Sequence, residues 1–220
     1  KKGDFYFQVD PFKIDSLDNF SNDQLKFDGT FSSGNIFPEF REQLTLQPDF
    51  SLGFVRETPE GGYPMYRGKG KFYDEIKLSH DGLRGDGSLK YVTSTTYSHD
   101  FIFYPDSMRT LADRYEVEKL VGEIEFPRVK AENTQMRWLP SKDIMYATTT
   151  DSGMVFYDKT SRFFGTTSLT PEQLSGDGIY KFQRAELTSR KMIFKAITLE
   201  ADTAEFTVRE SKVSEACLLK

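Results

Sequence analysis

The tripeptide Arg84-Gly85-Asp86 lies within "GLRGDGSLKY" at 82–91 and matches the sequence that adhesion ligands display on a tight turn. Adhesion chemistry needs the guanidinium and the carboxylate at an exposed loop tip. The stretch "QLSGDGIYKF" at 173–182 repeats the pattern Leu-x-Gly-Asp-Gly, with Ser175 in place of the arginine. Because the pattern recurs without the arginine, we interpret Gly-Asp-Gly as a structural hairpin or bulge.

The two Gly-Asp-Gly copies are the predicted structural turns, in which glycine takes a positive φ and aspartate bonds nearby backbone amides. Their residues are Gly85, Asp86, Gly87, Gly176, Asp177 and Gly178. A cation site is the alternative, since Asp81 and Asp86 share one loop. Calcium takes about six to eight oxygen ligands, which EF-hand loops supply at alternate positions. These aspartates are not spaced in that way, so the sequence predicts no metal and no cofactor.

Residues for nucleophilic or acid–base catalysis are few, because the chain has two histidines and one cysteine. His80 lies in a turn, His99 aligns with an arginine in the other copy, and Cys217 lies near the C-terminus. The motifs of serine hydrolases, P-loop proteins, zinc proteases and dinucleotide-binding folds are missing. Paired carboxylates that cleave glycosides remain the least favoured alternative, since an acidic β-protein offers such pairs by chance. We predict that the chain is not an enzyme.

Aromatic side chains suggest binding instead, with 20 Phe and 11 Tyr against one Trp. A platform for sugar rings or acyl chains would use rings near the middle of the chain. Its candidate residues are Trp138, Tyr146, Phe156 and Tyr157. The alternative is a hydrophobic core, because Phe163 occupies the same repeat position as Phe72. A carbohydrate- or lipid-binding β-domain is therefore the second functional hypothesis.

Charge and hydropathy limit the partners. The net charge of −5 and pI of about 5.2 argue against nucleic acid, whose binding needs clustered Lys and Arg. The densest basic run, "YRGKGKF" at 66–72, is followed by Asp74 and Glu75. No apolar run approaches the length of about 18 residues that a transmembrane helix needs. One cysteine permits no intrachain disulfide.

An internal repeat organises the sequence. Residues 72–103 align without a gap on residues 163–194, with ten identities in 32 positions and an offset of 91 residues. Self-similarity of about 90 residues is typical of proteins built from repeated structural units. We predict two full units, at 24–117 and 118–208.

The ends of the chain complete this division. Residues 1–23 match the closing part of a unit, and 209–220 form a C-terminal tail. We expect the chain to be an excised piece, with the first residues as the tail of a preceding unit. Phe5 and Phe7 should then pack against residues of about 24–60, because an apolar strand seldom stays unpaired in water.

Within each unit the apolar residues alternate with period two, which indicates β-strands. Turn-forming residues separate these runs at short intervals. Two segments, 38–46 and 107–120, have the composition of short helices, although the repeat partner of the second has that of a strand. The predicted fold is all-β: a tandem repeat of two antiparallel units of about 90 residues, solenoid- or jelly-roll-like, with few short helices.

Two stretches resemble known families. The run "GDGIYKFQRAELTSRKMIFKAITLEADTAEFTV" at 176–208 resembles the repeats of OstA/LptA-type envelope proteins, and "PFKIDSL" at 11–17 together with Leu-x-Gly-Asp-Gly resembles AsmA/TamB-type proteins. The resemblance implies a β-sheet trough that shields lipid between bacterial membranes. It also implies a periplasmic, outer-membrane-associated or extracellular location. The unit found in this chain is longer than a single strand-pair repeat.

The sequence therefore predicts a non-enzymatic β-repeat segment of a larger cell-envelope or secreted protein, with a scaffold or binding role. A single unit would expose its sheet edges and half a core, so its first partners should be neighbouring repeat units of the same chain. Lipid or glycan is the further partner class. Nucleic acid and a transmembrane segment are not expected.

Overall fold

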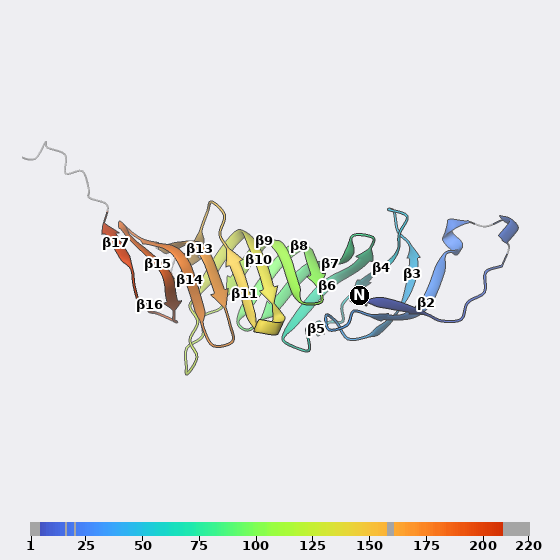
Figure 1. Ribbon diagram of the computed structural model, residues 1–220, viewed down its shortest axis with the longest axis horizontal. Helices are drawn as coiled ribbons and strands as arrows, with labels where there is room; N and C mark the ends of the chain where they lie inside the picture. The colour runs from blue at the N-terminus through green and yellow to red at the C-terminus, as the bar shows by residue number, and fades with distance from the viewer. Residues whose placement is uncertain (1–4, 16, 20, 158–160, 209–220) are drawn as a thin grey trace, which may run out of the picture.

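The computed structural model describes residues 5–15, 17–19, 21–157 and 161–208, and the predicted tail at 209–220 lies outside them (Figure 1). Within these ranges almost all regular secondary structure is β-strand. The helical segments are three-residue 3-10 turns: η1 (Leu17–Asn19), η2 (Asn22–Gln24) and η3 (Pro140–Lys142). The predicted all-β antiparallel class is confirmed.

In the described part of the chain, seventeen strands join in one antiparallel sheet. They are β1 (Tyr6–Val9), β2 (Lys26–Ser32), β3 (Phe40–Leu46), β4 (Leu52–Glu57), β5 (Tyr63–Met65), β6 (Gly70–Ser79), β7 (Gly82–Tyr91), β8 (Ser94–Tyr104), β9 (Ser107–Val117), β10 (Val129–Leu139), β11 (Ile144–Thr148), β12 (Met154–Phe156), β13 (Ser161–Leu169), β14 (Leu174–Phe182), β15 (Ala185–Phe194), β16 (Leu199–Ala201) and β17 (Glu205–Val208).

The sheet is a meander, because strands that follow each other in sequence lie beside each other (Figure 1). In three places two short strands pair with different parts of one longer strand: β4 and β5 with β6, β11 and β12 with β13, and β16 and β17 with β15. At the predicted unit boundary the sheet continues, since β9 pairs with β10 and Val117 lies opposite Val129. The division at 117/118 and the solenoid form therefore stay predictions, whereas a single sheet differs from the double sheet of a jelly roll.

The two segments with helical composition, 38–46 and 107–120, are strands instead. They contain β3 and β9, and helix is the wrong prediction for both. Burial along β9 alternates, with Thr110 and Ala112 buried between exposed Arg109, Leu111 and Asp113. This period of two, and hydrogen-bonded neighbours on both sides, outweigh a weak local preference for helix.

The sheet coils until hairpins from distant strands touch. The Tyr66 hydroxyl, between β5 and β6, lies 2.7 Å from the carbonyl oxygens of Tyr104 and Ser107 at the β8–β9 hairpin and donates to them. The Tyr91 hydroxyl donates to the Asp143 carbonyl at 2.7 Å, and burial raises the Tyr91 pKa to about 12. These contacts join hairpin to hairpin, and they enclose one face of the sheet.

That enclosed face holds the hydrophobic core, whose rings follow one another along the molecule. Phe31 packs on Phe40 and Phe54 near the N-terminal end. In the middle, Phe72 and Phe103 meet edge to face at 5.1 Å. The described core therefore runs as one cluster through the sheet and does not divide into two.

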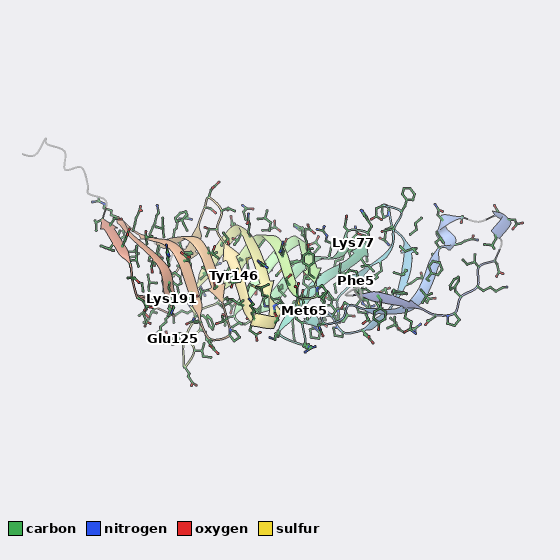
Figure 2. All side chains as sticks on the ribbon, in the orientation of Figure 1. Phe5, Met65, Lys77, Glu125, Tyr146 and Lys191 are labelled. Atoms are coloured by element: carbon green, nitrogen blue, oxygen red, sulfur yellow. The ribbon has the colours of Figure 1, made fainter. Side chains whose placement is uncertain are left out.

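The first strand packs as the sequence predicts. Strand β1 pairs with β2, where Phe7 lies opposite Phe31, and the rings of Phe5 and Phe31 are 6.3 Å apart. Phe5 and Phe7 are half-buried against the core. Figure 2 shows the labelled Phe5 beside the body of the sheet rather than at its far end.

Several non-ladder contacts recur 91 residues later. The Tyr157 hydroxyl donates to the Thr198 carbonyl at 2.8 Å, and these positions correspond to Tyr66 and Ser107. The second recurring contact is a reciprocal pair of hydrogen bonds between a threonine and a residue of the neighbouring strand. Their bonds are Thr58 N to Asp74 O, 2.7 Å, with Asp74 N to Thr58 Oγ1, 2.9 Å, and Thr149 N to Gly165 O, 2.9 Å, with Gly165 N to Thr149 Oγ1, 2.9 Å. The same backbone arrangement therefore occurs at two positions that are 91 residues apart.

Removing the closing hydroxyls should weaken the fold at both positions. We expect Tyr66→Phe to lower the free energy of unfolding by about 1–2 kcal/mol and Tyr157→Phe by about 0.5–1 kcal/mol, because each substitution removes the tyrosine's hydrogen bonding to hairpin carbonyls, while the Thr198 carbonyl keeps its bond from the Lys195 amide. Urea unfolding followed by circular dichroism measures both. Tyr6→Phe, at an exposed ring, is the control and should change nothing measurable. A loss at only one of the two tyrosines would contradict their equivalence.

Candidate functional site

The Arg-Gly-Asp tripeptide is not displayed on a loop. It lies in the middle of β7, hydrogen-bonded to β6 on one side and β8 on the other. Arg84 Nη1 donates to both carboxylate oxygens of Asp100 at 2.8 Å, and Asp86 lies 2.9 Å from Nδ1 of His99. Both charged side chains thus have partners on neighbouring strand β8, an arrangement that favours a structural role over adhesion.

The prediction that Gly-Asp-Gly forms turns is wrong, whereas its bulge alternative is found. The register shifts between Gly85 and Gly87 in the β7–β8 ladder, and between Gly176 and Gly178 in the β14–β15 ladder. A turn requires the chain to reverse, but here the strand continues to pair on both sides. The reversal before β7 takes place at residues 80–81 instead.

Each glycine has a separate physical reason. A Cβ on Gly85 would lie 2.5 Å from Phe72 and 2.8 Å from Phe103, and one on Gly176 would lie 2.8 Å from Phe194 and 2.9 Å from Phe163. The first glycine therefore makes room for two core rings from neighbouring strands. The last takes a positive φ at the bulge, 142° in Gly87 and 153° in Gly178. The recurrence of both ring pairs at the repeat offset is the sequence signal that identifies this role.

The aspartates do not hold the backbone as predicted. Asp86 is exposed and faces His99, while the exposed carboxylate of Asp177 makes no hydrogen bond to a described residue. On an extended strand the side chain points to solvent, away from the amides that a capping carboxylate would reach. The carboxylate therefore adds little to either bulge, and the glycines carry the motif.

The predicted aromatic platform is not formed. Trp138 and Phe156 are fully buried, and the platform prediction is wrong for both. Tyr146, labelled in Figure 2, lies on the outer face of β11 between buried Met145 and Ala147. The half-buried Tyr157 is engaged through its hydroxyl. The four rings do not share one surface.

Trp138 instead fills the centre of the coil. Its ring lies 5.1 Å from that of Tyr66 and 4.9 Å from that of Tyr91. A Cβ on Gly70 would lie 2.7 Å from the indole, so the glycine at the start of β6 admits it. Sequence reasoning missed this because the contact joins positions far apart in the chain.

His80 and Asp49 form an exposed cluster of charged side chains between two turns. His80 Nδ1 lies 2.6 Å from Asp49 Oδ2, and Ser51 donates from its amide and its hydroxyl to the other oxygen of Asp49. The hydrogen bond to Asp49 raises the pKa of His80, and the bonds from Ser51 and His80 lower the pKa of Asp49. The cluster joins the β3–β4 turn to the β6–β7 turn, so its geometry is that of a clamp.

Metal binding has no assembled site in the part of the chain described. Among those residues, no three His, Cys, Asp or Glu side chains are placed to hold an ion, and Cys217 lies outside them. None of the described helices has the length and apolar character needed to cross a bilayer.

No protein-family model, curated protein or solved structure matches the chain. The geometry is therefore the main basis for inferring function. It defines a coiled antiparallel sheet with a continuous core, recurrent closing contacts and glycines placed to admit aromatic rings.

The packing of rings around Gly85 and Gly176 predicts similar losses of stability when either glycine is replaced. Gly85→Ala and Gly176→Ala should each lower the free energy of unfolding by about 1–3 kcal/mol, because the added methyl group overpacks a pair of core rings. Gly61→Ala is the control, since its Cβ would meet no atom within 4 Å. Thermal and urea unfolding measure the series. A cost at Gly61 equal to the other two would overturn the packing explanation.

The clamp predicts a pH dependence. Because the folded-state pKa of His80 is raised, its contribution to stability is complete below about pH 6.5, the ordinary histidine pKa. It is then lost as the pH rises through the folded-state value. The urea midpoint should fall between about pH 5.5 and about pH 8.5, and His80→Gln should reduce that fall. An unchanged difference in His80→Gln would show that the clamp contributes nothing.

Proposed function

We propose that this chain is a non-enzymatic scaffold, a β-repeat segment of a larger cell-envelope or secreted protein. The repeated units extend one coiled sheet, and neighbouring units of the same chain are the first partners. The observation that carries the proposal is the recurrence of closing contacts at an offset of 91 residues, with Tyr66 and Tyr157 donating to equivalent hairpin carbonyls.

The strand register and the backbone conformation also support a scaffold of repeated units. Ser94 pairs with Val117 in the β8–β9 ladder, and Ala185 pairs with Val208 in the β15–β17 ladder at the same offset. The turns before β8 and β15 use a left-handed residue at equivalent positions, Val92 at φ 54° and Gln183 at φ 52°. Such units gain most of their stability from their neighbours.

The chemistry of the surface supports a role without catalysis. The ion pairs found among the described residues are exposed or half-exposed, such as Arg84 with Asp100 and Arg56 with Glu42. A glycoside hydrolase needs one carboxyl group kept protonated, commonly by an apolar pocket. The surface pairs described above offer no such environment.

A scaffold role is favoured over a lipid- or carbohydrate-binding one. The rings that suggested a platform, Trp138 and Phe156, face the interior of the coil. Location in the bacterial periplasm, at the outer membrane or outside the cell is the part of the proposal that rests on the family resemblance alone.

Deleting one period tests the scaffold proposal. Removal of residues 93–183, which are 91 residues, joins Val92 to Arg184 within equivalent turns and lets β7 pair with β15. We expect a shorter protein that keeps its β-sheet spectrum and unfolds cooperatively, because each retained strand meets an equivalent neighbour. Circular dichroism, size-exclusion chromatography and small-angle scattering measure fold and length.

The control deletion removes residues 93–178 from the same turn, which puts the junction inside β14 and breaks the period. It should aggregate or lose its cooperative transition. If both deletions fold equally well, or if both fail, the periodic scaffold is rejected.

A further inference from the structure

We propose that the free edge of β17, together with the end of β14, is a docking site for a β-hairpin that has the pattern of β10–β11. This inference rests on the proposed repeat scaffold and names its partner. The occupant is an antiparallel hairpin whose first strand pairs with β17 and whose far end covers Phe182.

The exposed rings at this end have buried equivalents in the body of the protein. Tyr91, Tyr115 and Val117 are 2%, 1% and 1% exposed. The positions 91 residues later are Phe182, Phe206 and Val208, and they are 44%, 64% and 60% exposed. Large apolar side chains at equivalent positions are thus covered in one copy and open in the other.

The body of the protein shows what covers them. Strand β10 pairs with β9 and sets Val129 opposite Val117 and Ala131 opposite Tyr115. Both β10 residues are buried. By this equivalence the partner strand for β17 has small or β-branched side chains at alternate positions, since a β-branched residue packs favourably across from an aromatic one.

The far end of the same hairpin covers the ring at the end of β7. Trp138, at the end of β10, packs on Tyr91 at 4.9 Å, and the Tyr91 hydroxyl reaches Asp143 just before β11. Phe182 at the end of β14 keeps the ring but has no hydroxyl. The matching occupant thus carries a large aromatic residue at this place, and it makes an apolar contact instead of a hydrogen bond.

The backbone of β17 is already in the receptive geometry. It pairs with β15 through the register that β9 uses with β8: Leu187 lies opposite Phe206 as Thr96 lies opposite Tyr115. The ladder found for β17 among the described strands is the one with β15, which leaves its other edge without a described partner strand. An edge strand with free amide and carbonyl groups is a template for strand addition.

The experiment appends a second copy of residues 118–208 directly after Val208 in the full chain, in place of 209–220. The native connection between β9 and β10, residues 118–128, then links β17 to the added copy of β10. Hydrogen exchange read by mass spectrometry should show amides of 205–208 slowed by at least about 100-fold, toward the protection of 114–117.

A matched pair of substitutions tests the contact itself. Phe206→Asp with Val208→Asp should leave the parent chain as stable as before, because both side chains are exposed there. In the extended chain the same pair should abolish the added protection. If 205–208 exchange as rapidly in the extended chain as in the parent, docking is rejected, whether the added copy is folded or not.

Should the extended chain be insoluble, a labelled peptide of residues 127–150 is titrated against the parent, with fluorescence anisotropy as the readout. Binding that the Asp substitutions remove supports the site, and lack of binding at millimolar concentration overturns it. The result is separable from the scaffold test. A folded 93–183 deletion with a failed extension would retain the scaffold and reject only the docking site.

Discussion

A sheet one layer thick must hide one of its faces, and this requirement governs the molecule. Here the sheet coils until its own hairpins meet, so that the inner face becomes a core without a second layer. The closing contacts are side chain to backbone: Tyr66 to the β8–β9 hairpin and Tyr91 to the β10–β11 hairpin. A tyrosine suits this position because its ring joins the apolar interior and its hydroxyl donates a hydrogen bond to a hairpin carbonyl.

Coiling this tight depends on glycine as much as on tyrosine. Rings from adjacent strands lie on the same inner face and crowd one another, and Gly85 and Gly176 relieve that crowding between their two phenylalanines. The bulge at the next glycine adds twist, which turns the strand toward the following one. Room for the rings and curvature of the sheet thus come from one five-residue motif, and this explains why the motif contains two glycines and tolerates either arginine or serine before the first.

Most strands of this fold can be predicted from short stretches of sequence, because period-two alternation and turn residues mark them. What could not be predicted depends on contacts between distant positions. Gly-Asp-Gly has the composition of a turn, and only the pairing of β7 with both β6 and β8 makes it a bulge. Trp138 suggested a binding surface because its neighbours Gly70, Tyr66 and Tyr91 lie far away in the chain. The segment at 107–120 has helical composition, but hydrogen bonds to a strand on each side make β9 a strand.

The direction of the strands gives the molecule a mechanical character. Most of them lie across its long axis, as Figure 1 shows, so tension applied between the two ends of the molecule acts to peel neighbouring strands apart. Peeling loads the ladder hydrogen bonds one after another, whereas shearing would load a whole strand at once. The hairpin contacts of Tyr66 and Tyr157 would be released in turn as the coil opens. From this geometry we expect the sheet to lengthen gradually under small forces instead of resisting them as a rigid rod.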